Sequence, residues 1–503
     1  MDSPVLSQLF RQLFRHPPCR SLKAPSPLSS HRAEYLRQSG HSRQQCRPFL
    51  SRRTAAKRKK GDSELHWVRR NDYPHDIEKG LMTYPLVTAK ELRRRRDRPR
   101  QVQMLTREFI DDSLYNPHYG YFSKHATIFS PGEPFDFNNM EDSPAFERLL
   151  AERYKEFEDR LDEIEPDVAR QLWHTPTELF RPYYGETIAR YLVSNYKLTL
   201  YPYHDLIIYE MGAGNGTMML NILDFIRDTD YEVYQRTKYK IIEISPALAD
   251  EQMRTLMGPL SEGGHLDHVE IINRSIFDWD TYVHSPCFFL ALEVFDNFGH
   301  DTIRYNYKTQ LPQQGGVLID EDGEFHEFYN NQIDPIAARF LRVRQAAARR
   351  PYPTPLGNKF MRTVRPSLLQ HEYTLPEYIP TRLLQFFDVL SNFFPAHRLV
   401  ASDFSVLPDA VPGLNAPVVQ TRYMRRPVTV STPFVHQGYF DIFFPTNFNV
   451  IEDIYRATTG KLTQVMSHED FVQRWAYIED TETRNGENPF LNWYRNASML
   501  MTV

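Results

Sequence analysis

Cysteine and long apolar runs are scarce in this sequence. Only three of its 503 residues are cysteines, Cys19, Cys46 and Cys287, which is too few for the disulfide framework of a secreted domain. The 18 histidines show no paired spacing and no Cys-x-x-Cys motif accompanies them, so we expect no structural zinc site and name no metal ligand. No run of about 18 apolar residues occurs, and the sequence therefore predicts no transmembrane helix.

Acidic residues are nearly absent from the first 60 residues. Residues 1–60 contain 14 Lys or Arg and two acids, a net charge of +12, whereas residues 61–503 contain 46 bases and 62 acids, a net charge of −16. Five apolar residues recur there at helical spacing: Leu6, Leu9, Phe10, Leu13 and Phe14. Such a basic, amphipathic N-terminus is typical of a transit peptide, and we expect a location in the mitochondrial matrix. The alternative is a disordered basic tail with a nuclear signal at residues 57–60.

The rest of the chain is rich enough in apolar residues, at 41% of the sequence, to bury a large core. Residues 61–205 are interpreted as a mainly helical N-terminal subdomain, in which residues 146–173 predict a charged surface helix. From residue 206 onward, short apolar runs alternate with helical patterns. This alternation predicts an α/β fold with a doubly wound, mainly parallel, Rossmann-like sheet across residues 206–503. The predicted strands are Leu206–Glu210, Tyr239–Ile244, Val269–Ile272, Phe288–Leu292 and Arg398–Asp403.

An insertion is expected between the fourth and fifth of these strands, at about residues 299–375. It contains a predicted hairpin, formed by Val317–Ile319 and Glu324–Tyr329 and turned at Asp322-Gly323. Helical patterns are also present at Met218–Ile226 and Leu383–Phe394. Cys287 is expected in a buried strand, where a thiol is inert.

A glycine cluster, Gly212, Gly214 and Gly216, follows the first predicted strand and opens a helix. Alternate glycines let the backbone turn tightly and approach a ligand closely. The third glycine comes one residue too early for the Gly-x-Gly-x-x-Gly dinucleotide pattern, which disfavours a dehydrogenase. Glu210, two residues before the first glycine, would repel a pyrophosphate but could pair with a cationic amino group. The pattern Glu-x-Gly-x-Gly-x-Gly resembles that of methyltransferases that use S-adenosyl-L-methionine (SAM), a ligand that carries an ammonium and a sulfonium, so we expect SAM as the ligand.

Two further acids are predicted to bind this cofactor. Glu243 ends the second strand, where a carboxylate can accept hydrogen bonds from both ribose hydroxyls. Asp278 follows the third strand and could meet the adenine amino group, with Ile276 or Phe277 against the ring. The alternative for Glu243 is an ordinary glutamate at a strand end.

Glu293 and Asp296 follow the fourth predicted strand. Because the carboxyl ends of parallel strands line the ligand crevice, we expect these two acids to orient the methyl acceptor as catalytic residues. Two carboxylates suit a guanidinium, which is planar and donates bidentate hydrogen bonds. For Asp296 the alternative is a helix cap.

At these motifs the chain resembles the MidA-type mitochondrial SAM-dependent methyltransferases, the family that contains the complex I assembly factor that methylates arginine. The resemblance extends from about Leu92 onward. The segments that carry it are Tyr115–Tyr121, His174–Glu178, Glu210–Thr217, Glu243–Pro246, Glu293–Asp296 and Gly438–Ile442. It implies a class I methyltransferase fold, SAM as cofactor and arginine N-methylation of a protein substrate such as a respiratory complex I subunit.

Two alternative functions stay open. One is a non-catalytic assembly factor that keeps SAM as a structural ligand. The other is a divergent paralogue with another mitochondrial substrate, because Leu292 and Phe404 replace an Asn and a Tyr that the family usually has. The basic run Arg93–Arg98 is interpreted as a solvated face or a contact to an acidic partner. Because the body is acidic, we expect no nucleic-acid partner.

Overall fold

The computed structural model describes residues 80–503 apart from 125, 165–170, 245 and 358–371. The predicted targeting tail, residues 1–60, lies outside the described residues. None of the described helices is long and apolar enough to cross a membrane.

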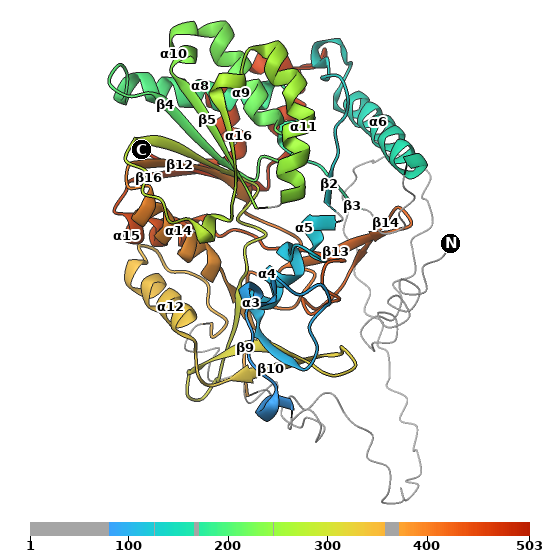
Figure 1. Ribbon diagram of the computed structural model, residues 1–503, viewed down its shortest axis with the longest axis vertical. Helices are drawn as coiled ribbons and strands as arrows, with labels where there is room; N and C mark the ends of the chain where they lie inside the picture. The colour runs from blue at the N-terminus through green and yellow to red at the C-terminus, as the bar shows by residue number, and fades with distance from the viewer. Residues whose placement is uncertain (1–79, 125, 165–170, 245, 358–371) are drawn as a thin grey trace, which may run out of the picture. The chain divides into compact units, whose positions relative to one another are not determined.

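A seven-stranded sheet forms the centre of the described chain, in the order β16-β17-β12-β7-β4-β5-β6 (Figure 1). Its strands are β4 (Leu206–Met211), β5 (Thr237–Glu243), β6 (Val269–Asn273), β7 (Cys287–Leu292), β12 (His397–Phe404), β16 (Thr463–Ser467) and β17 (Ala497–Thr502). The first five are mutually parallel, which confirms the predicted doubly wound sheet. β17 is antiparallel to both β12 and β16, and neither β16 nor β17 was predicted.

Successive side chains of each strand enter two different cores, because side chains alternate across a sheet. Ile208 of β4 packs in a core with three helices: α8 (Tyr183–Thr199), α9 (Thr217–Thr229) and α16 (His468–Trp475). Tyr209, its neighbour, packs on the other face with α12 (Pro335–Ala347), α14 (Thr381–Phe393) and α15 (Phe448–Thr459). Figure 1 shows these two groups of helices on opposite faces of the sheet. Such burial on both faces explains why the inner strands are continuous apolar runs.

Most of the predicted elements of this domain are present. α9 and α14 confirm the two helical patterns, and Cys287 is a buried free cysteine at the start of β7. Three other helices complete the domain: α10 (Tyr231–Gln235), α11 (Pro246–Gly263) and α17 (Pro489–Trp493).

The predicted hairpin is also confirmed, since β9 (Pro312–Ile319) pairs with β10 (Phe325–Asn330) in antiparallel register. The same sheet contains β8 (Asp301–Tyr305), β11 (Glu377–Ile379) and β1 (Val102–Leu105). β1 comes from the segment predicted as a helical subdomain, yet it pairs with β9, and α8 packs on α9 in the core around Ile208. The division at residue 205 stays a prediction, and contacts cross it. The bounds of the insertion, about 299–375, stay a prediction as well.

The charged helix predicted over residues 146–173 is wrong at its C-terminal end. Helix α6 covers Ser143–Ile164, and Trp173 lies in a short strand, β3 (Gln171–Trp173), which pairs with β2 (Ala126–Ile128). The sequence continues after α6 with Pro166, and a proline disfavours helical geometry in the residue before it. Other N-terminal helices of the described residues include α3 (Ala89–Leu92), α4 (Thr106–Tyr115), α5 (Tyr121–Lys124) and α7 (Pro176–Leu179).

A three-stranded sheet, β14-β13-β15, was not predicted from the sequence. Its strands are β13 (Val418–Tyr423), β14 (Arg426–Thr429) and β15 (Asp441–Phe443). β15 brings Asp441 next to the turn that follows β7, where Asn297 donates a hydrogen bond to it. This small sheet therefore contributes to the end of the cavity described next.

Candidate active site

A cavity of about 1120 Å³ opens at the carboxyl ends of the parallel strands. Ligands bind there in doubly wound folds, where the strand order reverses between β4 and β7. Seven of the eight predicted site residues line it: Glu210, Gly212, Gly214, Glu243, Asp278, Glu293 and Asp296. The eighth, Gly216, does not line it. A second cavity of about 400 Å³ shares Glu243 and Asp278 with the first and extends it beyond the end of β6.

The glycine loop needs glycine for its backbone geometry. Gly212, Gly214 and Gly216 all have positive φ, at 73°, 54° and 77°. A Cβ atom on Gly214 would lie 2.5 Å from Ile128 Cδ1, so even alanine would not fit without movement. Gly216 is the N-cap of α9, and a Cβ there would meet Leu256. Its role is therefore in packing and in starting the helix, while Gly212 and Gly214 face the cavity.

Glu210 lies at the base of the glycine loop, with 4% of its surface exposed. The Tyr239 hydroxyl donates a hydrogen bond to its Oε2 over 2.8 Å. Burial raises the pKa of Glu210 to about 7, although this hydrogen bond lowers it in part. A cationic group in the cavity, such as the predicted amino group of the cofactor, would favour the ionised form of Glu210.

Glu178 is a residue of this site that the sequence did not identify. Its side chain is buried beside the loop, and its Oε1 accepts hydrogen bonds from Asn215 Nδ2 (3.0 Å) and Thr217 Oγ1 (2.7 Å). Thr175 caps the short helix α7 by accepting from the Glu178 amide, and this fixes where the carboxylate points. The Thr-Pro-Thr-Glu sequence signals a helix start, but only the tertiary structure reveals its contact with the glycine loop.

Glu243, which is predicted to bind the ribose, lines the cavity at the end of β5. Gln252 of α11 donates a hydrogen bond to Glu243 Oε2 over 3.3 Å and another to the carbonyl of Gly214 over 2.8 Å. One amide thus links the second acid to the glycine loop. Glu243 and the glycine loop, which are predicted to hold neighbouring parts of the cofactor, are therefore fixed relative to each other.

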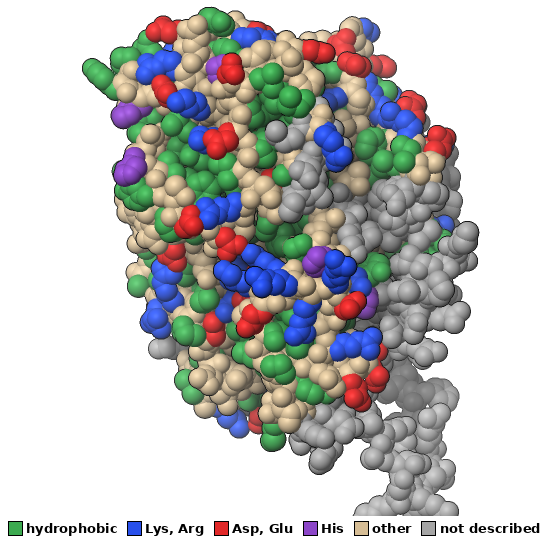
Figure 2. Space-filling view, viewed as in Figure 1, with side chains coloured by type: hydrophobic (Ala, Val, Ile, Leu, Met, Phe, Trp, Pro, Cys, Tyr) green, Lys and Arg blue, Asp and Glu red, His purple; other side chains and the backbone are tan. Residues whose placement is uncertain are grey.

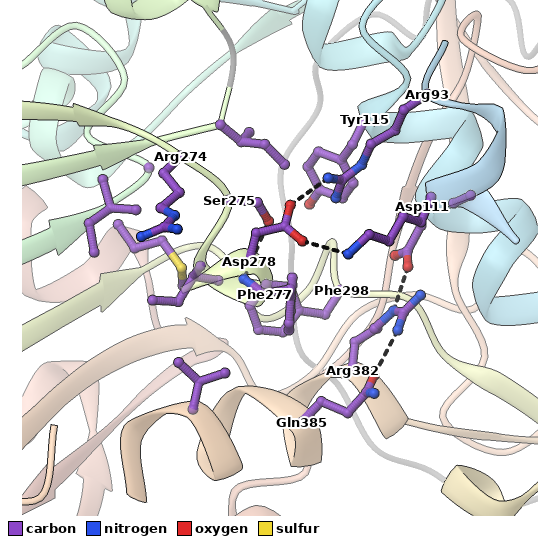
Figure 3. A pocket seen from close by; sticks show the side chains of 18 of the residues that line it. Arg93, Asp111, Tyr115, Arg274, Ser275, Phe277, Asp278, Phe298, Arg382 and Gln385 are labelled. Atoms are coloured by element: carbon purple, nitrogen blue, oxygen red, sulfur yellow. Dashed lines mark hydrogen bonds and ion pairs between the residues drawn. The ribbon is translucent and has the colours of Figure 1, made fainter. Parts of the chain in front are cut away.

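Asp278, predicted to meet adenine, carries two ion pairs. Lys90 Nζ lies 3.1 Å from Asp278 Oδ1, and Arg93 Nη1 lies 2.5 Å from Oδ2. Partial burial alone would raise the pKa of Asp278, but these hydrogen bonds lower it below its ordinary value. Figure 3 shows the carboxylate between Arg93 and the wall formed by Phe277 and Phe298. Adenine recognition by Asp278 stays a prediction.

Basic side chains cover the surface around α3, next to the end of the cavity that contains Asp278. Figure 2 shows Lys and Arg side chains gathered over α3. Arg94, Arg95 and Arg96 are exposed, whereas Arg93 lines both cavities. Arg94, Arg95 and Arg96 thus form an exposed face, the contact to an acidic partner stays a prediction, and Arg93 also reaches the candidate cofactor site.

The opposite end of the cavity contains a cluster of four carboxylates: Glu293, Asp296, Asp403 and Asp441. The first two lie in the turn after β7, where Glu293 adopts a positive φ of 55°. Asp403 of β12 shapes this turn, because its Oδ2 accepts the backbone N–H of Phe295 (2.8 Å) and of Asp296 (3.2 Å). The helix-cap interpretation of Asp296 is wrong: β7 is followed by this turn and then by β8, and no helix starts in the residues described there.

No basic side chain of the described residues forms an ion pair with any of these four carboxylates. Asp296 Oδ1 and Asp441 Oδ2 are buried, and neither has a hydrogen-bond partner in the described part of the chain. Burial and the repulsion between neighbouring carboxylates raise the pKa of Glu293 and of Asp296 well above the usual range. Burial likewise raises the pKa of Asp403 to about 7. Such a cluster must either hold protons or receive a cation.

The chain matches a known protein family. A family model described as "Putative S-adenosyl-L-methionine-dependent methyltransferase" matches residues 187–467, more than half of the chain. Among solved structures, a COG1565 superfamily member from Burkholderia thailandensis bound to S-adenosyl-homocysteine has a TM-score of 0.48 and 14% identity, over 80% of this chain and 88% of that chain.

Two curated relatives share one name, "Protein arginine methyltransferase NDUFAF7 homolog, mitochondrial". The relative from Schizosaccharomyces pombe is 26% identical over 381 residues, which are 73% of this chain and 79% of the relative. The relative from Saccharomyces cerevisiae is 22% identical over 340 residues, 63% of this chain and 77% of the relative. The predicted mitochondrial location agrees with both names. The chain belongs to the matched family: it is a SAM-dependent methyltransferase with the class I fold, and SAM is its cofactor.

Proposed function

We propose that this methyltransferase transfers a methyl group to an arginine side chain of a mitochondrial protein, with a respiratory complex I subunit as the expected partner. The observation that carries the proposal is the carboxylate cluster, which forms no ion pair with a basic side chain of the described residues. A guanidinium stays cationic at any physiological pH and can donate hydrogen bonds to two carboxylates at once. The names of the two relatives support the same substrate class.

The residues of the cofactor end fit SAM. Its methionine and ribose portions would approach the glycine loop, where Gly214 leaves room that a Cβ would fill. Glu210 would pair with the amino group, Glu243 with the ribose hydroxyls, and Asp278 with the adenine. When bound, SAM supplies a methyl group on a sulfonium. No residue of this chain has to form a covalent bond in the reaction.

The acceptor end would position and polarise the arginine. Glu293 and Asp296 would orient the guanidinium, and alignment of two reactants can supply roughly 7–11 kcal/mol of the barrier in favourable cases. An arginine nitrogen that gains a methyl group must lose a proton. Burial and neighbouring carboxylates raise the pKa of Asp296, so its carboxylate is a suitable proton acceptor at this position.

The proposal is tested by methylation of mitochondrial proteins from a strain that lacks this gene. The purified enzyme and methyl-labelled SAM are added to the extract, and mass spectrometry identifies the modified residues. We expect labelled methylarginine on one or a few proteins, including a complex I subunit. Label on lysine or on a small molecule would contradict arginine methylation, and label on another protein alone would indicate the divergent paralogue.

The non-catalytic alternative has its own test in living cells. A strain that carries both Glu293→Gln and Asp296→Asn would lose complex I activity if methyl transfer is the function. Full complementation by this double variant, together with failure of Gly214→Arg, would show that only cofactor binding matters. The exposed Glu152→Gln on α6 is the matched control for a lost surface charge.

A further inference from the structure

Asn297 is a buried side chain at the acceptor end of the cavity. It follows Asp296 in the turn after β7, and it lines the main cavity although only 8% of its surface is exposed. Its Nδ2 donates one hydrogen bond to Asp441 Oδ1 and one to the Ile442 carbonyl oxygen, each over 3.1 Å. Both amide hydrogens are therefore engaged by β15.

The orientation of this amide is set by its surroundings. The two ends of an asparagine amide are told apart by their hydrogen-bond partners. The reverse orientation would place Oδ1 against the Ile442 carbonyl oxygen, which has no proton to share. The backbone is also held, because the Tyr115 hydroxyl donates to the Asn297 carbonyl over 3.2 Å. No donor among the described residues hydrogen-bonds to Oδ1, so this atom is left as an acceptor at the cavity wall.

We propose that Asn297 Oδ1 is a further contact to the methyl acceptor, and that Asp441 is the residue that positions it. The inference rests on the proposed function, because it assumes that the acceptor is a guanidinium. The side chains of Glu293, Asp296 and Asn297 together carry five oxygens, of which Asp296 Oδ1 is buried, and a guanidinium has five N–H donors. A lysine ammonium has only three, so it would leave acceptors without a partner.

An amide is the suitable acceptor at this position for an electrostatic reason. Burial raises the pKa of Glu293 and of Asp296, and repulsion from Asp403 raises both further, so another carboxylate facing the cavity would increase the repulsion. A neutral oxygen adds a hydrogen bond without adding charge. Asp441 is fully buried and does not line the cavity, so it acts through Asn297 rather than on the acceptor.

The contact by Asn297 is tested with Asn297→Ala and Asn297→Ser, neither of which presents the amide oxygen. For an arginine peptide we expect the KM to rise about tenfold, the size expected for a lost hydrogen bond to a charged group. The Kd for SAM stays unchanged, which also shows that the variants are folded. Asn492→Ala, at an exposed position on α17, is the control and leaves both constants unchanged. An unchanged KM in both Asn297 variants would overturn the contact.

The positioning role of Asp441 is tested by a double-mutant cycle. Asp441→Ala should raise the KM as Asn297→Ala does, and the double variant should be no worse than Asn297→Ala alone. Asp441→Asn, whose side-chain oxygen can still accept from Asn297, should restore most of the affinity. Additive effects, or an Asp441→Asn variant as poor as Asp441→Ala, would show that Asp441 acts independently of Asn297.

A binding assay separates this inference from the proposed function. Calorimetry of the enzyme saturated with S-adenosyl-homocysteine uses ethylguanidinium and ethylammonium as probes. Wild-type enzyme should bind ethylguanidinium more tightly, and Asn297→Ala should lose about tenfold of that affinity. If the wild type prefers neither probe and methylates no arginine peptide, the proposed function fails. If the wild type and Asn297→Ala both prefer ethylguanidinium and bind it with the same affinity, the proposed function stands and only the role of Asn297 is refuted.

Discussion

The two ends of the main cavity differ in how their acidic side chains are partnered. At the cofactor end, Glu210 accepts from Tyr239, Glu243 accepts from Gln252, and Asp278 is paired with two cations. At the acceptor end, four carboxylates lie together without an ion pair in the described part of the chain. Each acid of the cofactor end thus has a side-chain donor, whereas Asp296 Oδ1 and Asp441 Oδ2 at the other end have no partner among the described residues. Under the proposed function, the methyl acceptor would supply the missing donors.

The largest expected effect is at the cofactor end, in the glycine loop. Gly214→Val should abolish SAM binding, because the position has a positive φ and a Cβ would lie 2.5 Å from Ile128. Calorimetry should show that SAM binds at least a hundredfold more weakly. This is a loss of about 2.7 kcal/mol of binding free energy, because each factor of ten corresponds to about 1.36 kcal/mol. Gly258→Ala is the control, since a Cβ at this helical position meets nothing within 4 Å. Normal SAM binding by Gly214→Val would refute our assignment of the loop.

Removal of one carboxylate charge at the acceptor end should reduce catalysis without weakening the binding of SAM. Glu293→Gln and Asp296→Asn are each expected to lower kcat/KM for an arginine peptide by about 10- to 100-fold, because a charge-assisted hydrogen bond contributes roughly 1.5–3 kcal/mol. The Kd for SAM should change less than twofold. A large change in SAM affinity would place these carboxylates at the cofactor instead. Both constants come from one set of steady-state and calorimetric measurements.

The pH dependence of kcat/KM should report on the carboxylates of the acceptor end. A guanidinium binds best to ionised carboxylates, and burial raises the pKa of Asp403 to about 7 and that of Asp296 above its usual range. kcat/KM should therefore rise as the pH increases through about 7 and above. Asp296→Asn should flatten this rise. A profile that is flat from pH about 6 to about 9 in the wild type would contradict the raised pKa values.

The stability of the free enzyme should show the opposite trend with pH. A carboxyl whose pKa is higher in the folded than in the unfolded state stabilises the fold where it stays protonated. This stabilisation is lost as the pH rises toward the folded pKa, at a slope of about 1.4 kcal/mol per pH unit for each group. The Tm should therefore fall between pH about 5 and about 8, and less steeply in Asp296→Asn. A Tm that rises over this interval would contradict the raised pKa values of the carboxylate cluster.

The smallest expected effect is at the ion pairs of Asp278. Lys90 is 77% exposed, so its ion pair contributes little to stability. Lys90→Ala should change the Kd for SAM by no more than about fivefold, which corresponds to the upper end of the roughly 0.2–1 kcal/mol range for an exposed pair. Raising the salt concentration should mimic the substitution in the wild type. A tenfold change would show that Lys90 contacts the cofactor directly.

The inner strands and the cofactor end were predictable because their signals are local. An apolar run buried on both faces identifies β4, β5 and β7, and the spacing of Gly212, Gly214 and Gly216 identifies the loop after β4. β16 and β17 escaped prediction because Thr463–Ser467 and Ala497–Thr502 are short and mix polar with apolar residues.

The partners of the acceptor end were not predictable for a different reason. Asn297 and Asp441 are separated by more than a hundred residues, and β15 brings them together only in the folded chain. Glu178 is likewise distant in sequence from the loop it supports. Spacing rules apply to neighbours along the chain, so they identified Glu293 and Asp296 but not the side chains that hold them.

The position of β17 has a consequence for how the two cores are held together. This strand lies between β12 and β16, and its Leu500 packs in one core while Met499 and Met501 pack in the other. Without β17, β12 would present an open edge and both cores would lack these side chains. One strand therefore contributes to both cores beneath the candidate active site, so damage to β17 would destabilise both faces of the sheet at once.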